Sequence, residues 1–157
     1  MGAKGANAVV RRFCWRNRIS IITAVVVSPQ RRHLALYFQL QGRNIKARNV
    51  ADFLRHLLGH LRRQVVLLWD EALIHKGRAV KELLGRRRRL HIERFLKYAP
   101  EPNPVEFVWT QTKRRMPDSC LQSARELKKM VDESIGHIRS SQTLLKSCLL
   151  ASELSWP

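Results

Sequence analysis

Cysteine is scarce in this sequence, and the cysteines that are present follow no metal-binding pattern. They are Cys14, Cys120 and Cys148, an odd number without any C-x-x-C pair. This arrangement argues against both a disulfide framework and a zinc site. The sequence therefore fits a reducing cytoplasm, in which thiols remain free.

Long apolar runs are also missing. The longest, residues 19–27, is interrupted by Ser20 and Thr23 and is far shorter than the roughly 20 residues that cross a bilayer. Arg16 and Arg18 precede it, but no small-residue cleavage site accompanies it, so we do not interpret it as a signal peptide. We expect a soluble, cytoplasmic protein without a membrane partner.

Acidic residues are few in comparison with basic ones. The 157 residues include 12 Asp and Glu against 30 Lys and Arg, which gives a formal net charge of +18 at pH 7. The positive charge recurs along the whole chain, and polyanions are the commonest partners of such a surface. Charge alone thus predicts a nucleic-acid partner, but it does not distinguish an enzyme from a binding protein.

The first half of the chain predicts strands and one secure helix. Residues 18–27 are rich in β-branched side chains and residues 33–42 alternate, which together predict an antiparallel hairpin. Apolar residues of 49–63 recur with a helical period, and Asn49 is a plausible N-cap. "QVVLLWD", residues 64–70, suits a strand covered on both faces, as in a parallel or mixed sheet between helices.

The second half predicts more helix than strand. We expect a helix over 75–84, a strand over 91–96, and helices over 104–115 and from Ser123 onward. Ser123 and Glu126 form a capping box at the start of the last helix. The expected order is ββαβαβαα. Because periodicity weakens near residue 140, we divide the chain into a domain at 1–139 and a tail of open structure at 140–157.

Two acids stand where side chains can face a crevice. Asp70 ends the apolar strand, and ligands of α/β sheets gather beyond the carboxyl ends of strands. Glu106 occupies the third helical position after Asn103, a preferred N-cap, and Pro104, which suits the first position. Taken singly, Asp70 is either an ordinary turn residue or a metal ligand. Glu106 likewise either completes a capping box or holds a metal.

The motifs "VVLLWDEALIHKG" and "YAPEPNPVEFVWTQTKRRM" place these acids on either side of the thirty-five residues 71–105. In this order and spacing they resemble the catalytic core of mariner-superfamily DDE transposases, in the bacterial insertion-sequence branch. The resemblance covers about residues 2–139. It implies an α/β, RNase H-like mixed sheet flanked by helices, with Asp70 and Glu106 as catalytic metal ligands and with His75 and Asn103 as secondary site residues.

The resemblance also implies a chemistry and partners. In this family three carboxylates hold two Mg²⁺ or Mn²⁺ ions, which activate an attacking oxygen and stabilise the leaving oxygen during phosphodiester displacement. DNA, in the form of transposon ends, is the implied substrate, and a homodimer is the implied assembly. The basic residues that we expect to contact phosphates near the catalytic face are Lys76, Arg78, Arg86, Arg87, Arg88, Arg89, Lys113, Arg114 and Arg115.

The carboxylate set is incomplete in this sequence. The family's first aspartate lies on a strand upstream of the part that matches "GANAVV", and no Asp or Glu occurs before residue 52. We therefore expect an inactive, N-terminally truncated transposase without the first strand and the DNA-binding domain, which a complementing upstream fragment would complete. Two alternatives stay open: a non-catalytic basic nucleic-acid-binding remnant, and a product that folds poorly and has no function.

Overall fold

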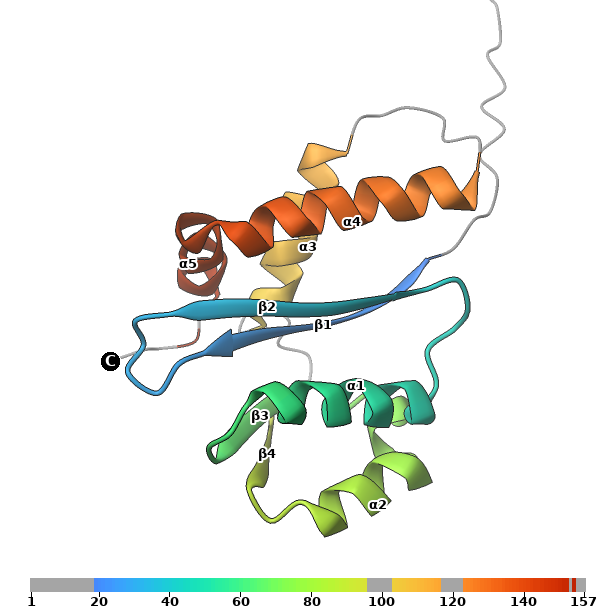
Figure 1. Cartoon of the computed structure of the whole chain (residues 1–157), viewed down its shortest axis with the longest axis vertical. Coiled ribbons are helices and arrows are strands. Elements are labelled where there is room, and N and C mark those ends of the chain that lie inside the picture. Colours follow the sequence, from blue (N-terminus) through green and yellow to red (C-terminus); the bar gives the residue numbers. More distant parts are fainter. Residues whose placement is uncertain (1–18, 96–102, 117–122, 153, 155–157) are drawn as a thin grey trace, which may run out of the picture.

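A β-hairpin lies between two groups of helices. In this computed structural model, which describes residues 19–95, 103–116, 123–152 and 154, β1 (Ser20–Val27) pairs antiparallel with β2 (Leu34–Gln41). Figure 1 shows three helices on one side of the hairpin, α3 (Pro104–Arg115), α4 (Ala124–Ser140) and α5 (Gln142–Ala151). Two helices lie on the other side, α1 (Ala47–His60) and α2 (Arg78–Arg86). The expected hairpin is confirmed, and the eight expected elements occur in the predicted order, with the short helix η1 and the helix α5 in addition.

Each face of the hairpin has its own hydrophobic core. This follows from the strand geometry, because successive side chains point to opposite faces. The core with α3, α4 and α5 contains the buried residues Leu34, Leu36, Val108, Val131, Ile135, Ile138, Leu145 and Cys148. The core with α1 and α2 contains the buried residues Val50, Ala51, Phe53, Leu54, Leu57, Val80 and Leu83.

A second pair of strands belongs to the layer of α1 and α2. β3 (Val65–Trp69) pairs in parallel with β4 (Leu90–Arg94), and the short 3-10 helix η1 (Leu73–Lys76) follows β3. The mixed α/β class is thus confirmed. The described strands nevertheless form two separate two-stranded sheets, β1-β2 and β3-β4, where the sequence predicted one mixed sheet.

One face of β3 is uncovered among the described residues. Leu67 and Trp69 pack against the core with α1 and α2, whereas the side chains of Val66 and Leu68 are 59% and 39% exposed. The expectation of a strand covered on both faces is therefore wrong for this part of the chain. Its physical reason is that α3, α4 and α5 pack on the hairpin, and their core includes no residue of β3.

Helix ends follow local chemistry, with two departures from the predicted boundaries. The first helix begins after Lys46, and Asn49 is not its N-cap but the residue whose side chain accepts the Lys46 N–H, at 2.9 Å. The helix expected over 75–84 is interrupted at Gly77, which separates η1 from α2. As predicted, Ser123 caps α4 by accepting the Glu126 N–H at 3.2 Å.

The C-terminal residues that the sequence left open form α5 and pack into the core. Ser141 caps this helix by accepting the Leu144 N–H at 3.2 Å. Burial raises the pKa of the Cys148 thiol, while a hydrogen bond with Ser147 opposes the rise, so this thiol stays protonated near neutral pH. Cys14 and Cys120 lie outside the described residues. No helix in the described ranges is long and apolar enough to span a membrane.

Gly77 precedes α2 and lies against Ala47, the first residue of α1, so its lack of a side chain is required there. A Cβ atom at Gly77 would stand 2.2 Å from the Cβ of Ala47. Its φ of −67° suits any residue, so the requirement concerns space. We expect Gly77→Ala to lower the free energy of unfolding by about 1–3 kcal/mol through overpacking, as measured by urea denaturation.

A matched control for this substitution exists in α1. A Cβ at Gly59 would meet nothing within 4 Å, and alanine favours helices over glycine by about 0.8–1.0 kcal/mol. Gly59→Ala is therefore expected to leave the protein equally or more stable. Similar losses for the two variants would contradict the close approach at Gly77.

Candidate metal site and DNA-binding surface

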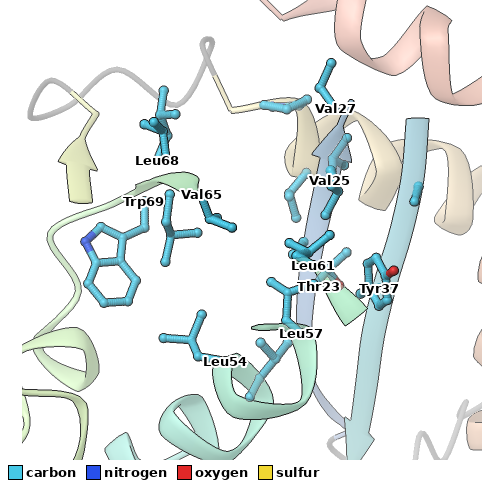
Figure 2. A pocket seen from close by; sticks show the side chains of 18 of the residues that line it. Thr23, Val25, Val27, Tyr37, Leu54, Leu57, Leu61, Val65, Leu68 and Trp69 are labelled. Carbon is cyan, nitrogen blue, oxygen red and sulfur yellow. The ribbon is translucent and has the colours of Figure 1, made fainter. Parts of the chain in front are cut away.

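A long groove separates the hairpin from β3. It has a volume of about 1120 Å³, and α1 and the first turn of α3 contribute to its walls. Figure 2 shows β1 on one side, β3 on the other and α1 beneath, represented by the labelled residues Thr23, Val25 and Val27, Val65, Leu68 and Trp69, and Leu54 and Leu57. Both candidate acids, Asp70 and Glu106, line this groove.

Asp70 follows β3 and shapes the turn that leaves the sheet. Its Oδ1 accepts the Ala72 N–H at 3.0 Å and lies 3.0 Å from His75 Nδ1. The side chain is 63% exposed. Both of these contacts use Oδ1. The other carboxylate oxygen, Oδ2, makes neither contact and is the one placed to bind a cation. The turn role and the ligand role that the sequence left as alternatives are thus compatible.

His75 is held in one orientation beside Asp70. Its ring stacks on Trp69 with the centroids 4.3 Å apart and the planes 2° from parallel. Its Nδ1–H also donates to the backbone carbonyl of Asp70 at 3.0 Å. These contacts place the proton on Nδ1, so Nε2 is the nitrogen available to a ligand of the groove.

Glu106 is positioned by the cap of α3. The Asn103 side chain accepts the Val105 N–H at 3.1 Å, Pro104 stands at the first helical position, and the Glu106 N–H donates to the Asn103 carbonyl at 3.1 Å. The predicted cap is confirmed. It leaves Glu106 exposed in the first turn, where its carboxylate faces the positive end of the helix dipole. Pro100 and Pro102 lie outside the described residues.

Four predicted site residues from two distant segments of the sequence line one groove. Asp70, His75, Asn103 and Glu106 all line the one groove. The described ranges contain no group of three or more His, Cys, Asp or Glu residues that could hold a metal ion. Two exposed carboxylates suit Mg²⁺ or Mn²⁺, which prefer oxygen ligands, but they supply only part of a coordination shell.

Comparison with protein families determines the affiliation of the chain. The family described as DDE superfamily endonuclease matches residues 1–128. The chain belongs to this DDE endonuclease family. Membership implies a divalent metal ion and a DNA substrate. Among curated proteins, no sequence matches this one.

Solved structures agree with the fold of a DDE endonuclease. The Mos1 transposase catalytic domain with raltegravir and magnesium is similar at 14% identity and a TM-score of 0.52, covering 88% of this chain and 85% of that chain. The same domain with raltegravir and manganese is 14% identical with a TM-score of 0.52, and the match covers 88% of this chain and 84% of that chain. The crystal structure of the catalytic domain of Mos1 mariner transposase is 14% identical with a TM-score of 0.50, and the match covers 88% of this chain and 83% of that chain. The RNase H-like fold is thereby confirmed.

The basic residues of the DDE endonuclease chain do not form one surface. β3 and β4 are parallel, with Val65 beside Leu90 and Trp69 beside Arg94. Arg86, Arg87 and Arg88 precede β4, whereas Asp70 follows β3. These arginines therefore lie at the N-terminal end of the two strands, whereas Asp70 lies at the C-terminal end. The five residues of each strand separate the two ends by about 17 Å at 3.3 Å per residue. The expectation that they lie near the catalytic face is wrong.

Arg89 has a structural role. Its guanidinium donates to the carbonyls of Leu58 and Leu61 at the end of α1, and to the carbonyl of Arg63 at 3.0 Å. Carbonyls at the end of a helix lack partners within it. Arg89 supplies these partners and ties α1 to β4, so we leave it out of the proposed DNA contacts.

The remaining candidates lie on η1, α2 and α3. Lys76 ends η1, and Arg78 begins α2 as an exposed residue whose Nε donates to Glu82 at 2.8 Å. Lys113, Arg114 and Arg115 are exposed in the last turn of α3. Lys113 is seven residues from Glu106, about 10.5 Å along the same helix face.

One ion pair near Asp70 was missed by sequence reasoning. Arg94 NH1 lies 3.6 Å from Glu71 Oε1. Glu71 directly follows Asp70, and its pairing with Arg94 offsets the negative charge that Glu71 adds beside this acid. No local signal identified this partner, because the parallel pairing that brings Arg94 to Trp69 is a tertiary feature.

Proposed function

We propose that this chain is the metal-binding part of an insertion-sequence transposase, which acts on transposon-end DNA by Mg²⁺- or Mn²⁺-dependent strand cleavage and transfer. Asp70 and Glu106 are the two metal ligands. One observation carries the proposal: these two exposed carboxylates come from different elements and line the same groove. The family affiliation supports the substrate and the metal.

Each residue of the groove has a defined task in this proposal. Asp70 and Glu106 bind the cations through their carboxylates, and Asn103 fixes the first turn of α3 so that Glu106 faces the groove. His75 positions Asp70 through its Nδ1 contact at 3.0 Å. When bound, a pair of divalent ions activates the attacking oxygen and stabilises the leaving one.

The proposal requires a third carboxylate that the described residues of the groove do not supply. We propose that a complementing upstream transposase fragment contributes it, and that the chain alone binds metal weakly and cleaves no DNA. A homodimer on paired DNA ends is the proposed assembly. The test is a titration of the chain with Mn²⁺, in which electron paramagnetic resonance (EPR) measures the concentration of the free ion. Binding that does not depend on Asp70 and Glu106 would refute the assignment.

Binding of duplex DNA is expected to depend steeply on salt, because each neutralised phosphate releases counterions. A triple alanine variant of Lys113, Arg114 and Arg115 should reduce the slope of log K against log [NaCl] by about 0.9 per lost phosphate contact. Fluorescence anisotropy of a labelled duplex at several NaCl concentrations measures this slope.

The matched control removes the same charge from another helix. Arg125, Lys128 and Lys129 are exposed on α4, and their triple alanine variant should keep most of the wild-type slope. Equal slopes for the two triple variants would show that net charge, rather than the end of α3, governs DNA binding.

A second candidate function is a non-catalytic nucleic-acid-binding protein. The observation that favours it is the exposed group of Arg86, Arg87 and Arg88, which lies away from the groove. Salt-dependent DNA binding that is lost on replacing these arginines, together with no Mn²⁺ binding at Asp70 and Glu106, would support this function over the first.

A further inference from the structure

Exposed arginines gather where β3 and β4 begin. They come from the connection that leads into β3 and from the end of α2 with the connection that leads into β4. The parallel register, which sets Val65 beside Leu90, brings both connections to the same end of the strand pair. We call this group the arginine face, and its members are Arg62, Arg63, Arg86, Arg87 and Arg88.

The backbone that carries the arginine face is held in place by Arg89. The guanidinium of Arg89 donates to carbonyls at the end of α1 and to the Arg63 carbonyl at 3.0 Å. Its own carbonyl accepts the Val65 N–H at 2.8 Å, and the Leu90 N–H donates to the Arg87 carbonyl at 3.0 Å. The two connections are thus joined before any ligand arrives, which lowers the entropy lost on binding.

The positive charge of the arginine face has no nearby counterpart in the sequence. No Asp or Glu occurs between Asp52 and Asp70, or between Glu82 and Glu93. The ion pairs within the described part of the chain involve none of the five arginines. Like charges gathered in this way repel one another, and a bound polyanion relieves that repulsion.

The chemistry of the arginine face favours the backbone of double-stranded DNA. Arginine binds phosphate oxygens in a bidentate fork. Residues 58–64 and 85–90 contain no Phe, Tyr or Trp, on which unpaired bases would stack. They also contain none of the exposed large apolar side chains that enter a membrane surface. In the described chain, those side chains are Val66, Leu68, Leu73 and Leu150.

The arginine face is separate from the basic residues at the end of α3. Figure 1 shows α3 on one side of the hairpin, and β3, β4 and α2 on the other. The exposed group of Lys113, Arg114 and Arg115 ends α3, so it belongs to the layer opposite the arginine face. Two cationic surfaces in opposite layers can each contact a different duplex.

We propose that the arginine face is a second DNA-binding site, which holds the phosphate backbone of a duplex other than the one at the end of α3. This inference rests on the proposed function for DNA as the ligand and for the contacts at the end of α3. It differs from the second candidate function, because the arginine face acts beside the metal site and does not replace it.

The test counts the duplexes that each chain binds. A labelled duplex of about twelve base pairs, or about 40 Å at 3.4 Å per pair, is titrated with the full chain in EDTA, at a duplex concentration well above Kd. Fluorescence anisotropy gives the equivalence point. We expect two duplexes for the wild type and for the α4 triple variant, and one for the triple variant at the end of α3. One duplex is also expected for the face variant, in which alanine replaces Arg86, Arg87 and Arg88.

A second variant tests whether the two connections form one surface. It combines Arg62→Ala with Arg63→Ala in the chain that already carries the triple alanine at the end of α3, so that the arginine face is the remaining site. Duplex binding should weaken at least about tenfold, and the slope of log K against log [NaCl] should fall by about 0.9 per lost phosphate contact. Because the replaced arginines are exposed, urea denaturation should show a nearly unchanged midpoint.

Several results would overturn the inference. They are a wild-type chain that binds one duplex, a face variant that still binds two, and unchanged affinity after replacement of Arg62 and Arg63. Equal affinity of the arginine face for a single strand of the same length would assign it to unpaired nucleic acid. A face variant that binds two duplexes but no longer binds phosphatidylserine vesicles would assign it to a membrane.

Failure of this inference is distinguishable from failure of the proposed function. EDTA removes divalent ions, so the duplex count does not depend on metal binding at Asp70 and Glu106, which the Mn²⁺ titration measures. The salt slope of the triple variant at the end of α3 tests the first DNA contact separately. A chain with a working metal site and one duplex would therefore refute the arginine face alone.

Discussion

Asp70→Asn and Glu106→Gln are each expected to weaken Mn²⁺ binding by at least about tenfold, which corresponds to about 1.4 kcal/mol. The amide keeps the size and the hydrogen-bonding shape of the side chain but removes its charge, and hard divalent cations prefer carboxylate oxygen. EPR of the free ion measures the affinity directly. Because both side chains are exposed, the substitutions should leave the unfolding midpoint nearly unchanged.

Two further acids provide matched controls for this prediction. Asp52 is exposed in α1, where it pairs with Arg55, and Glu133 is exposed in α4, where its Oε1 lies 3.8 Å from Lys129. Neither lines the groove. Asp52→Asn and Glu133→Gln should retain the wild-type affinity. If all four variants lost the same affinity, Mn²⁺ would be held by general charge rather than by the groove.

Leu145→Ala is expected to lower the free energy of unfolding by about 2–5 kcal/mol, since it removes a buried side chain and leaves a cavity. Leu145 is fully buried, with 0% exposure, in the core between the hairpin and α3, α4 and α5. Urea denaturation monitored by circular dichroism measures the loss. A cooperative transition in the wild-type chain would also argue against a product that folds poorly.

Leu150 in the same helix is the control. Its side chain is 80% exposed, and surface substitutions usually change stability by no more than about 0.5 kcal/mol. Leu150→Ala should therefore be close to neutral. If Leu145→Ala also changed the free energy of unfolding only slightly, α5 would contribute little to the stability of the fold. Residues 140–157 would then be a tail that does not stabilise the domain.

Local chemistry explains which parts of the fold the sequence predicted well. The hairpin, α3 and the start of α4 depend on β-branched runs, on Pro104 after Asn103 and on Ser123 before Glu126. Each signal acts within a few residues. One error lies beside another element: Gly77, which interrupts the helix expected over 75–84, lies against Ala47 of α1.

The sequence by itself determined the elements, the basic charge and the two acids at the spacing of an endonuclease motif. Only the tertiary structure decided which of these groups meet. It placed Asp70 and Glu106 on one groove, turned Arg89 inward to the end of α1, and left Val66 and Leu68 exposed on β3. The physical reason is that caps and strand propensities act between near neighbours, whereas burial of apolar faces joins elements that are distant in the chain.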